Sequence, residues 1–174
     1  MINKIAKLYK VPVFESPVGF KYIGLKMMEE NALIGGEESG GFGFRGHIPE
    51  RDGILSALLI LEMMEKTGRK PSELIKHLED LVGHHAYNRV DISFADDDRS
   101  VLQKRFLEMN PDTMDGSRIS YADDMDGKRF ILDDGSWLII RFSGTEPLLR
   151  IYSESYSDVR VGNLISEARN ILGV

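Results

Sequence analysis

The 174-residue chain contains no cysteine, and this absence excludes two classes of structure at once. It leaves neither a disulfide framework nor a cysteine-based metal site. Long apolar runs are also missing. The longest, Ile54 to Leu61, is far shorter than the roughly 20 residues of a membrane-spanning helix. The segment from Met1 to Lys4 lacks the apolar core of a signal peptide. We therefore expect a soluble cytoplasmic protein.

Positive charge is in deficit as well. The chain has 22 Lys and Arg residues against 28 Asp and Glu residues, which gives a net charge of −6. A nucleic-acid surface needs a basic stripe to neutralise phosphates, so this balance argues against nucleic-acid binding. The phosphate-binding motif G-x-x-x-x-G-K-[ST] and the nucleophile motif G-x-S-x-G are both absent. Hydrophobic residues make up 42% of the chain, enough for the core of one large domain or two small ones.

The first half of the chain alternates helical and extended patterns, which is typical of an α/β domain. The expected elements are a helix over 2–9, a strand over 12–14, a helix over 21–31, a strand over 32–34, and helices over 53–66 and 71–82. Asp52 is placed to cap the helix over 53–66, and Gly68 to end it. Apolar residues cover most of the circumference of that helix, so we expect it to be largely buried.

The pattern changes near residues 83–88, where we place a domain boundary. The expected elements beyond it are a strand over 90–94, a helix ending near 109, strands over 118–122, 128–132, 136–142 and 148–153, and a C-terminal helix. Asp126-Gly127 and Asp134-Gly135 predict tight hairpin turns. The run from Asp96 to Asp98 is best explained as a helix cap with favourable charge at the helix dipole. The second half is therefore predicted to be an antiparallel sheet with helices before and after it, an α+β domain.

The first candidate site is the loop Gly-Gly-Glu-Glu-Ser-Gly-Gly over residues 35–41. An ionised carboxylate such as that of Glu37 accepts hydrogen bonds from neighbouring sugar hydroxyls, and Ser39 can donate or accept. Glycine on both sides lets the backbone approach a sugar ring closely. The alternative is an ordinary polar turn that follows a strand. The loop alone does not decide between the two.

The second candidate site is the loop over residues 141–147. The guanidinium of Arg141 matches a phosphate through its planar fork of donors. Ser143 and Thr145 add hydroxyl donors, and Gly144 exposes its own amide, as in an anion-binding nest. The alternative is an ordinary hairpin loop that ends at Pro147. Together the two loops suggest one ligand that carries both features, a phosphosugar.

Three further features have competing interpretations. Arg51 could bring positive charge to a ligand phosphate, or be a surface arginine near a helix start. His84-His85 has no third metal ligand at a suitable spacing, so a solvated linker is the better interpretation. Asp124 and Asp126 resemble part of a calcium loop, but the first and last ligand positions of that pattern are not matched, and a hairpin turn explains them.

Taken together, the motifs resemble those of the α-D-phosphohexomutase family, the phosphoglucomutases and phosphomannomutases. The resemblance runs through residues 16–23, 35–41, 47–53 and 141–147 and covers nearly the whole chain. It implies an incomplete α/β/α sandwich domain over 1–84, which corresponds to domain 3 of the family. A C-terminal domain over 85–174 follows, with an antiparallel four-stranded sheet packed with helices, like the TATA-box-binding protein. The resemblance favours phosphoglucomutase-like members, because Gly41 stands where some phosphomannomutases have histidine.

The resemblance also implies roles for individual residues. Glu37 and Ser39 match the sugar-binding motif G-E-x-S-G, and Arg51 and Lys21 match positions near the same site. The phosphate-binding set is the R-x-S-[NG]-T match: Arg141, Ser143, Gly144 and Thr145. In the family these loops hold the sugar hydroxyls and the phosphate that is not being transferred.

The family interconverts hexose 1-phosphate and hexose 6-phosphate through a phosphoserine and a bisphosphorylated sugar. Its serine motif T-A-S-H-N-P and its magnesium loop D-G-D-G-D-R are absent from this chain. We therefore assign no catalytic residue and no metal ligand here, and expect Mg²⁺ only in the complete enzyme. The resemblance implies a C-terminal fragment that binds glucose or mannose phosphates or hexose 1,6-bisphosphate. Its expected partners are the N-terminal domains of the same enzyme and a second copy, through an exposed edge of domain 3. The alternative is a free-standing, non-catalytic phosphosugar-binding or interaction module.

Overall fold

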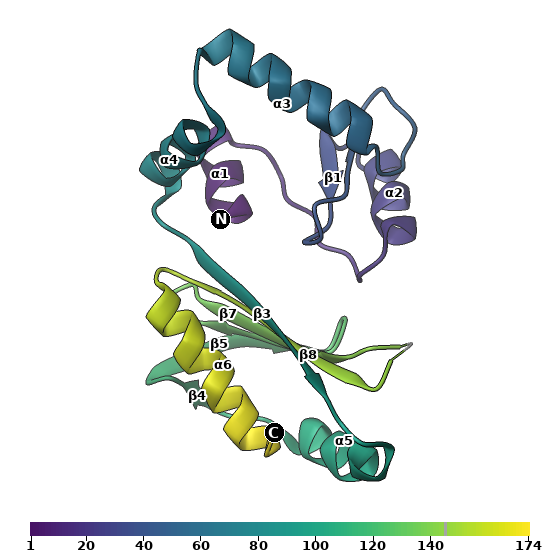
Figure 1. The fold of residues 1–174 in the computed structure, drawn as a ribbon, viewed down its shortest axis with the longest axis vertical. Helices are drawn as coiled ribbons and strands as arrows, with labels where there is room; N and C mark the ends of the chain where they lie inside the picture. The colour runs from purple at the N-terminus through teal and green to yellow at the C-terminus, as the bar shows by residue number, and fades with distance from the viewer. Residues whose placement is uncertain (145) are drawn as a thin grey trace. The chain divides into compact units, whose positions relative to one another are not determined.

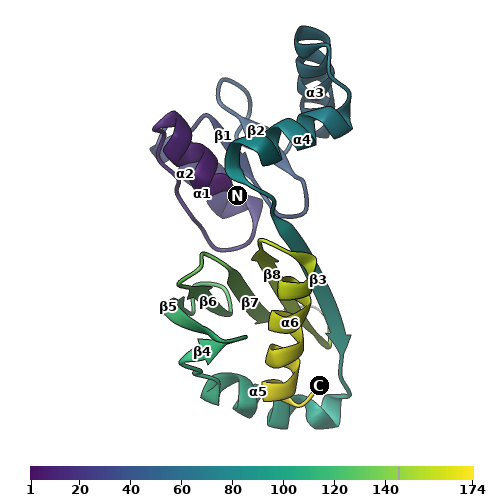
Figure 2. The same cartoon turned by 90° about the vertical axis from the view of Figure 1, so that its left-hand side faces the viewer.

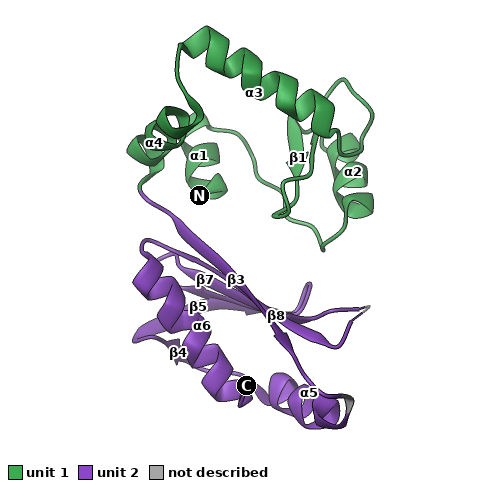
Figure 3. Ribbon diagram, viewed as in Figure 1, with its two compact units in different colours: residues 1–83 green, residues 84–174 purple. Residues whose placement is uncertain are grey.

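The computed structural model describes residues 1–144 and 146–174 and, for residue 96, the backbone. The chain folds as two compact units, residues 1–83 and residues 84–174 (Figure 1, and Figure 3, where the units are green and purple). The division falls at Gly83, where the backbone adopts a φ of +86°. None of the helices in the described residues is both long enough and apolar enough to span a bilayer.

Unit 1 contains four helices and one short hairpin among its described residues. Its elements are α1 (Ile2–Tyr9), α2 (Phe20–Glu29), β1 (Ile34–Gly36), β2 (Phe42–Phe44), α3 (Gly53–Thr67) and α4 (Pro71–Val82). β1 and β2 pair antiparallel, with Gly35 opposite Gly43. Helix α2 packs against β1 so closely that a Cβ on Gly35 would lie 2.4 Å from Met27 Sδ. Glycine in the hairpin is therefore required by packing.

Two expectations for unit 1 are wrong. Residues 12–14 form no strand, since they join neither sheet of the described residues, and Pro12 lacks the N–H that a central strand needs. Helix α3 is not buried: no residue in it is, and Ile54 and Leu58 are 79% and 57% exposed. A hairpin of two three-residue strands is too small to cover a helix that is apolar around most of its circumference.

Unit 2 contains one six-stranded antiparallel sheet and its helices (Figure 2). Its elements are β3 (Ala86–Ser93), a 3₁₀ turn over Asp96–Asp98, α5 (Arg99–Glu108), β4 (Thr113–Met114), β5 (Ser117–Asp123), β6 (Lys128–Leu132), β7 (Trp137–Phe142), β8 (Leu148–Ser155) and α6 (Asp158–Leu172). The strand order is β3-β8-β7-β6-β5-β4. The four central strands expected over 118–153 are β5 to β8, and β3 and β4 extend the sheet on either side. The predicted fold class, α/β followed by α+β, is confirmed.

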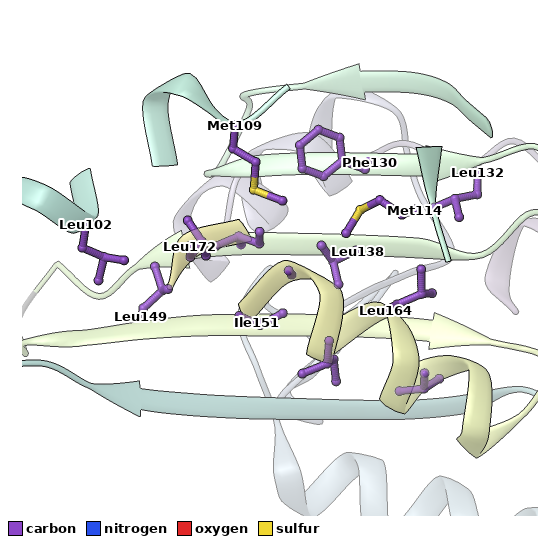
Figure 4. Packing of buried hydrophobic residues seen from close by; sticks show 14 of the residues in the cluster. Leu102, Met109, Met114, Phe130, Leu132, Leu138, Leu149, Ile151, Leu164 and Leu172 are labelled. Atoms are coloured by element: carbon purple, nitrogen blue, oxygen red, sulfur yellow. The ribbon is translucent and has the colours of Figure 1, made fainter. Parts of the chain in front are cut away.

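The hydrophobic core of unit 2 lies between the sheet and helices α5 and α6 (Figure 4). Leu138 and Ile140 on β7 and Leu149 and Ile151 on β8 are fully buried. They occupy alternate positions, so one face of each strand is apolar, as the period of two in a strand requires. Helix α6 supplies a matching stripe that includes Leu164, also fully buried.

A buried arginine ties α6 to two hairpin turns of the sheet. The side chain of Arg160 is 10% exposed. Its guanidinium donates to Asp115 Oδ2 at 2.6 Å, to Ser117 Oγ at 2.6 Å and to Asp134 Oδ2 at 3.0 Å. These bonds satisfy charges that would otherwise be costly to bury. Sequence patterns did not reveal this cluster, because its members lie up to 45 residues apart.

Candidate functional site

The loop predicted to bind sugar is the tight turn that joins β1 to β2. The Glu37 N–H donates to the Gly41 carbonyl at 2.9 Å, and the Gly40 N–H donates to the Glu37 carbonyl at 3.0 Å. Gly40 has a φ of +87°, a conformation that favours glycine. Glu37 therefore follows β1 directly, and Ser39 stands exposed at the tip of the turn.

Glu37 and Arg51 come from different motifs, and the structure brings them into direct contact. Arg51 Nη1 lies 3.1 Å from Glu37 Oε2. The carboxylate is 14% exposed and the guanidinium 54%. The guanidinium also lies over the Phe20 ring, 5.7 Å from its centroid, and its Nε lies 3.3 Å from Glu50 Oε1. Arg51 is thus oriented by three neighbours, and the Glu37 carboxylate keeps further lone pairs for hydroxyl donors.

Gly41 makes room for this arrangement. A Cβ at position 41 would lie 2.5 Å from Arg51 Cδ and 2.9 Å from Arg51 Cγ. The aliphatic part of Arg51 therefore crosses the face of Gly41 to reach Glu37. Gly41 does not have a positive φ, so any residue could adopt its backbone conformation. The space taken by Arg51 is what excludes a side chain at this position.

The entry to α3 fixes the backbone next to Arg51. Asp52 Oδ1 accepts the Leu55 N–H at 2.8 Å, so the predicted N-cap is confirmed. Asp52 Oδ2 lies 2.8 Å from His47 Nε2. The hydrogen bond from the Leu55 backbone, followed by that from His47, lowers the pKa of the Asp52 carboxyl below its usual value. The segment from His47 to Asp52 is thereby closed into a short loop that presents Arg51.

Lys21 occupies a different place. It lies on the first turn of α2 and is exposed, and its Nζ is 4.7 Å from the centroid of the Tyr22 ring. In the described part of the chain, Lys21 does not join the Glu37–Arg51 ion pair. The structure therefore brings together two of the four residues predicted for the sugar site, Glu37 and Arg51, and Ser39 lies on the same loop as Glu37.

The loop predicted to bind phosphate joins β7 to β8. The Ser143 N–H donates to the Leu148 carbonyl at 2.8 Å, and the Leu148 N–H donates to the Glu146 carbonyl at 2.8 Å. Ser143 is only 5% exposed, whereas Gly144 is exposed and a Cβ on it would meet nothing within 4 Å. Thr145 lies outside the described residues. Among the described residues of the loop, Gly144, Glu146 and Pro147 are exposed, and Gly144 has no side chain to cover its amide.

Arg141 projects from β7 at the base of this loop and pairs with Asp126. Arg141 Nη1 lies 2.9 Å from Asp126 Oδ2, and the two side chains are 19% and 36% exposed. A Cβ on Gly127 would lie 2.2 Å from the Ile140 carbonyl oxygen and 2.7 Å from Arg141 Cβ. The Asp126-Gly127 turn therefore packs directly on the backbone of β7 at Ile140 and Arg141.

Sequence patterns did not predict this pair. They identified Asp126 only as a turn residue, 15 positions from Arg141. The signal that was available is the register of the β6–β7 hairpin. Lys128 pairs with Ile140, so one further step places Gly127 opposite Arg141.

A second arginine stands beside Arg141. Arg150 on β8 is its register partner, so two like charges face each other across neighbouring strands. Carboxylates offset this repulsion: Arg150 Nη2 lies 3.2 Å from Glu146 Oε2, and Arg150 Nε lies 3.6 Å from Asp91 Oδ2. The base of the loop is therefore a cluster of paired charges. Among the side chains that the structure describes, here and in the rest of the chain, no group of three or more His, Asp or Glu residues could hold a metal ion.

Comparison with known proteins identifies the class to which this fold and these loops belong. Residues 1–81 match the sequence profile described as phosphoglucomutase/phosphomannomutase, alpha/beta/alpha domain III. Residues 103–171 match the profile of the phosphoglucomutase/phosphomannomutase C-terminal domain. The chain belongs to the phosphoglucomutase/phosphomannomutase family, the α-D-phosphohexomutases, and the resemblance inferred from its motifs is confirmed.

Individual relatives agree. A phosphoglucomutase/phosphomannomutase of Thermococcus kodakarensis is 34% identical over 91% of this chain and 32% of its own length. A phosphoglucosamine mutase of Methanococcus aeolicus is 32% identical over 95% of this chain and 35% of its own length. A crystal structure of a Thermus thermophilus protein assigned as a phosphomannomutase superposes with a TM-score of 0.77 at 33% identity, covering 99% of this chain and 34% of the other. The chain spans about a third of the length of these relatives.

A more distant structure shares the fold. N-acetylphosphoglucosamine mutase of Aspergillus fumigatus, crystallised with GlcNAc-6P and magnesium, superposes with a TM-score of 0.56 at 15% identity. The superposition covers 98% of this chain and 38% of the Aspergillus fumigatus protein. At this identity the likeness concerns the fold alone.

Proposed function

We propose that this chain is the substrate-recognition part of a phosphohexomutase that interconverts hexose 1-phosphate and hexose 6-phosphate. Unit 1 contacts the sugar hydroxyls, and unit 2 holds the phosphate that is not being transferred. The substrates are glucose or mannose phosphates and the hexose 1,6-bisphosphate that forms between them. Phosphoserine chemistry and Mg²⁺ belong to other domains of the complete enzyme, because this chain contains neither motif.

The observation that carries the proposal is the combination at the β7–β8 loop. A guanidinium stands at its base, and the Gly144 backbone at its tip is open to solvent. Arginine has five N–H donors, of which Asp126 engages one at Nη1, so donors remain for a phosphate. Each charge-assisted hydrogen bond contributes about 1.5–3 kcal/mol. Two or three of them together contribute about 3–9 kcal/mol, a range that includes the roughly 4 kcal/mol of millimolar affinity.

The sugar loop complements this arrangement. The Glu37 carboxylate accepts hydrogen bonds from ring hydroxyls, Arg51 holds that carboxylate in place, and Ser39 adds a hydroxyl at the tip of the turn. Holding a hexose by its hydroxyls and by its distal phosphate orients the reacting oxygen, which is positional catalysis. The three peripheral oxygens of a phosphate are nearly equivalent, so one loop can accept the phosphate of either sugar orientation.

A titration tests the proposal. In the ¹⁵N-labelled chain, glucose 1,6-bisphosphate should shift the backbone amides of the 141–146 segment, and Arg141→Ala should abolish these shifts. Arg169→Ala is the matched control, because Arg169 is an exposed arginine on α6 in the same unit. The chain alone should not turn over glucose 1-phosphate. Equal shifts in the wild type and in Arg141→Ala would reject the loop assignment.

A further inference from the structure

The Asp126–Arg141 ion pair places a fixed negative charge at the arginine proposed to receive the phosphate. The two groups lie 2.9 Å apart, and the pair is partly buried rather than fully solvated. Asp126 is held there by its own turn: Gly127 has a φ of +89° and packs against β7. The carboxylate is therefore positioned by the fold before any ligand arrives.

The guanidinium of Arg141 depends on this contact for its orientation. Its Nε is buried and has no hydrogen-bond partner among the described residues. Arg150, directly opposite on β8, has a like charge that Glu146 and Asp91 only partly offset. Asp126 supplies the counter-charge at Nη1 and favours one direction for the side chain. An arginine side chain that is already held in one orientation loses less conformational entropy on binding an anion than a freely rotating one does.

We infer that Asp126 is a positioning residue with two opposing effects on phosphate binding at Arg141. It orients the guanidinium, and as an anion sharing that guanidinium it weakens the binding of phosphate. This inference rests on the proposed function. It adds that Asp126 limits the site to moderate affinity. Moderate affinity is needed because the protein must release the sugar phosphate and bind it again in the opposite orientation.

The two effects separate by substitution. Asp126→Asn keeps an oxygen that accepts from Nη1 and removes the charge. Asp126 is 36% exposed, so water screens most of its charge. With nearly water-like screening, two unit charges about 5 Å apart repel by an energy equivalent to roughly a three- to ten-fold change in a dissociation constant. Asp126→Asn should therefore bind inorganic phosphate about three- to ten-fold more tightly than the wild type. Asp126→Ala loses both effects and should bind more weakly than Asp126→Asn.

The experiment is a titration of the whole 174-residue chain with inorganic phosphate at low ionic strength, followed through the Ser143 and Gly144 amides. Asp124→Asn is the matched control, since it removes one negative charge from the same β5–β6 connection at an exposed position. It should change the dissociation constant by less than about two-fold, because its charge is more fully screened. Equal affinities for the wild type and Asp126→Asn would overturn the inference, and so would equal gains in Asp126→Asn and Asp124→Asn.

Two further readouts keep the inference separate from the proposed function. If Arg141→Ala binds phosphate as the wild type does, the proposed function fails. If Arg141→Ala abolishes binding while Asp126→Asn leaves it unchanged, only the role of Asp126 fails. In NMR spectra recorded without ligand, the Nη protons of Arg141 should give separate signals in the wild type and in Asp126→Asn, because the guanidinium group rotates slowly. In Asp126→Ala the group should rotate freely, so these signals should merge into one average. Averaged protons in the wild type would overturn the positioning role whether or not phosphate binds.

Discussion

The contact between Gly41 and Arg51 leads to a prediction about the sugar loop. In Gly41→Ala, the new methyl group would lie 2.5 Å from Arg51 Cδ. Carbon atoms pack best at roughly 3.5–4.0 Å, so the arginine must retreat by about 1 Å or more. Its Nη1 bond to Glu37 Oε2 is 3.1 Å long, and such a retreat breaks it. The backbone itself tolerates alanine, because Gly41 does not have a positive φ.

The size of the effect follows from the exposure of the pair. Arg51 is 54% exposed, so solvent screening limits the ion pair to about 0.2–1 kcal/mol. If Glu37 binds sugar through the orientation set by Arg51, Gly41→Ala should weaken binding of glucose 1,6-bisphosphate by up to about five-fold. Arg51→Ala should have a similar effect. The double variant should bind no more weakly than Arg51→Ala alone, because both changes remove the same interaction.

The assay is a four-protein cycle of wild type, both single variants and the double variant, with dissociation constants from NMR titration. Gly43→Ala is not a suitable control, because its Cβ would lie 2.9 Å from the Phe20 ring. Gly53→Ala is the suitable control, since a Cβ there meets nothing within 4 Å and Gly53 does not have a positive φ. Additive losses in the cycle would refute the argument, and so would a Gly41→Ala protein that keeps the Glu37–Arg51 contact and full affinity.

Three further predictions concern stability and pH. Arg160→Met should lower the free energy of unfolding of unit 2 by about 3 kcal/mol in urea unfolding, because it leaves Asp115 and Asp134 without their counter-charge. The control Arg169→Met, on the exposed side of α6, should lower it by less than about 0.5 kcal/mol. Amides of α3 should exchange at least about tenfold faster than those of β7, because α3 has no buried residue; equal protection would contradict the exposure of unit 1. Because the pKa of Asp52 is lowered in the folded protein, its helix cap contributes stability at pH values above the usual Asp pKa. That stability is lost as the pH falls through the folded-state pKa. The Leu55 amide shift should therefore titrate below roughly pH 4, and a midpoint above it would show the opposite shift.

Local signals in the sequence predicted most of the secondary structure. Asp52 caps α3, and Gly68 ends it with a φ of +65°. The hairpin glycines Gly127 and Gly135 have φ values of +89° and +83°, as their Asp-Gly turns required. These features depend on side chains and backbone angles within a few residues of one another. The strands expected over 128–132, 136–142 and 148–153 are β6, β7 and β8, with bounds that agree to within two residues.

The wrong expectations have a common origin. A helix that is apolar all round is buried only if something is there to cover it, and unit 1 offers one short hairpin. The prediction of burial for α3 took the pattern as sufficient. The segment over 12–14 has the apolar residues of a strand but finds no strand to pair with, since pairing is a long-range event. The exposed apolar residues of unit 1 remain the basis for the expected self-association and for docking of the other domains of the enzyme.

By itself, the sequence determined the family, the two domain types and the two loops that carry the candidate chemistry, because motifs are short and their chemistry is local. The tertiary structure decided which charges meet. It joined Glu37 to Arg51 across 14 positions and Arg141 to Asp126 across 15, and it buried Ser143 while leaving Gly144 open. Such pairings depend on strand register and on the space left by Gly41 and Gly127, so they are seen only when segments 14 or 15 positions apart are placed together.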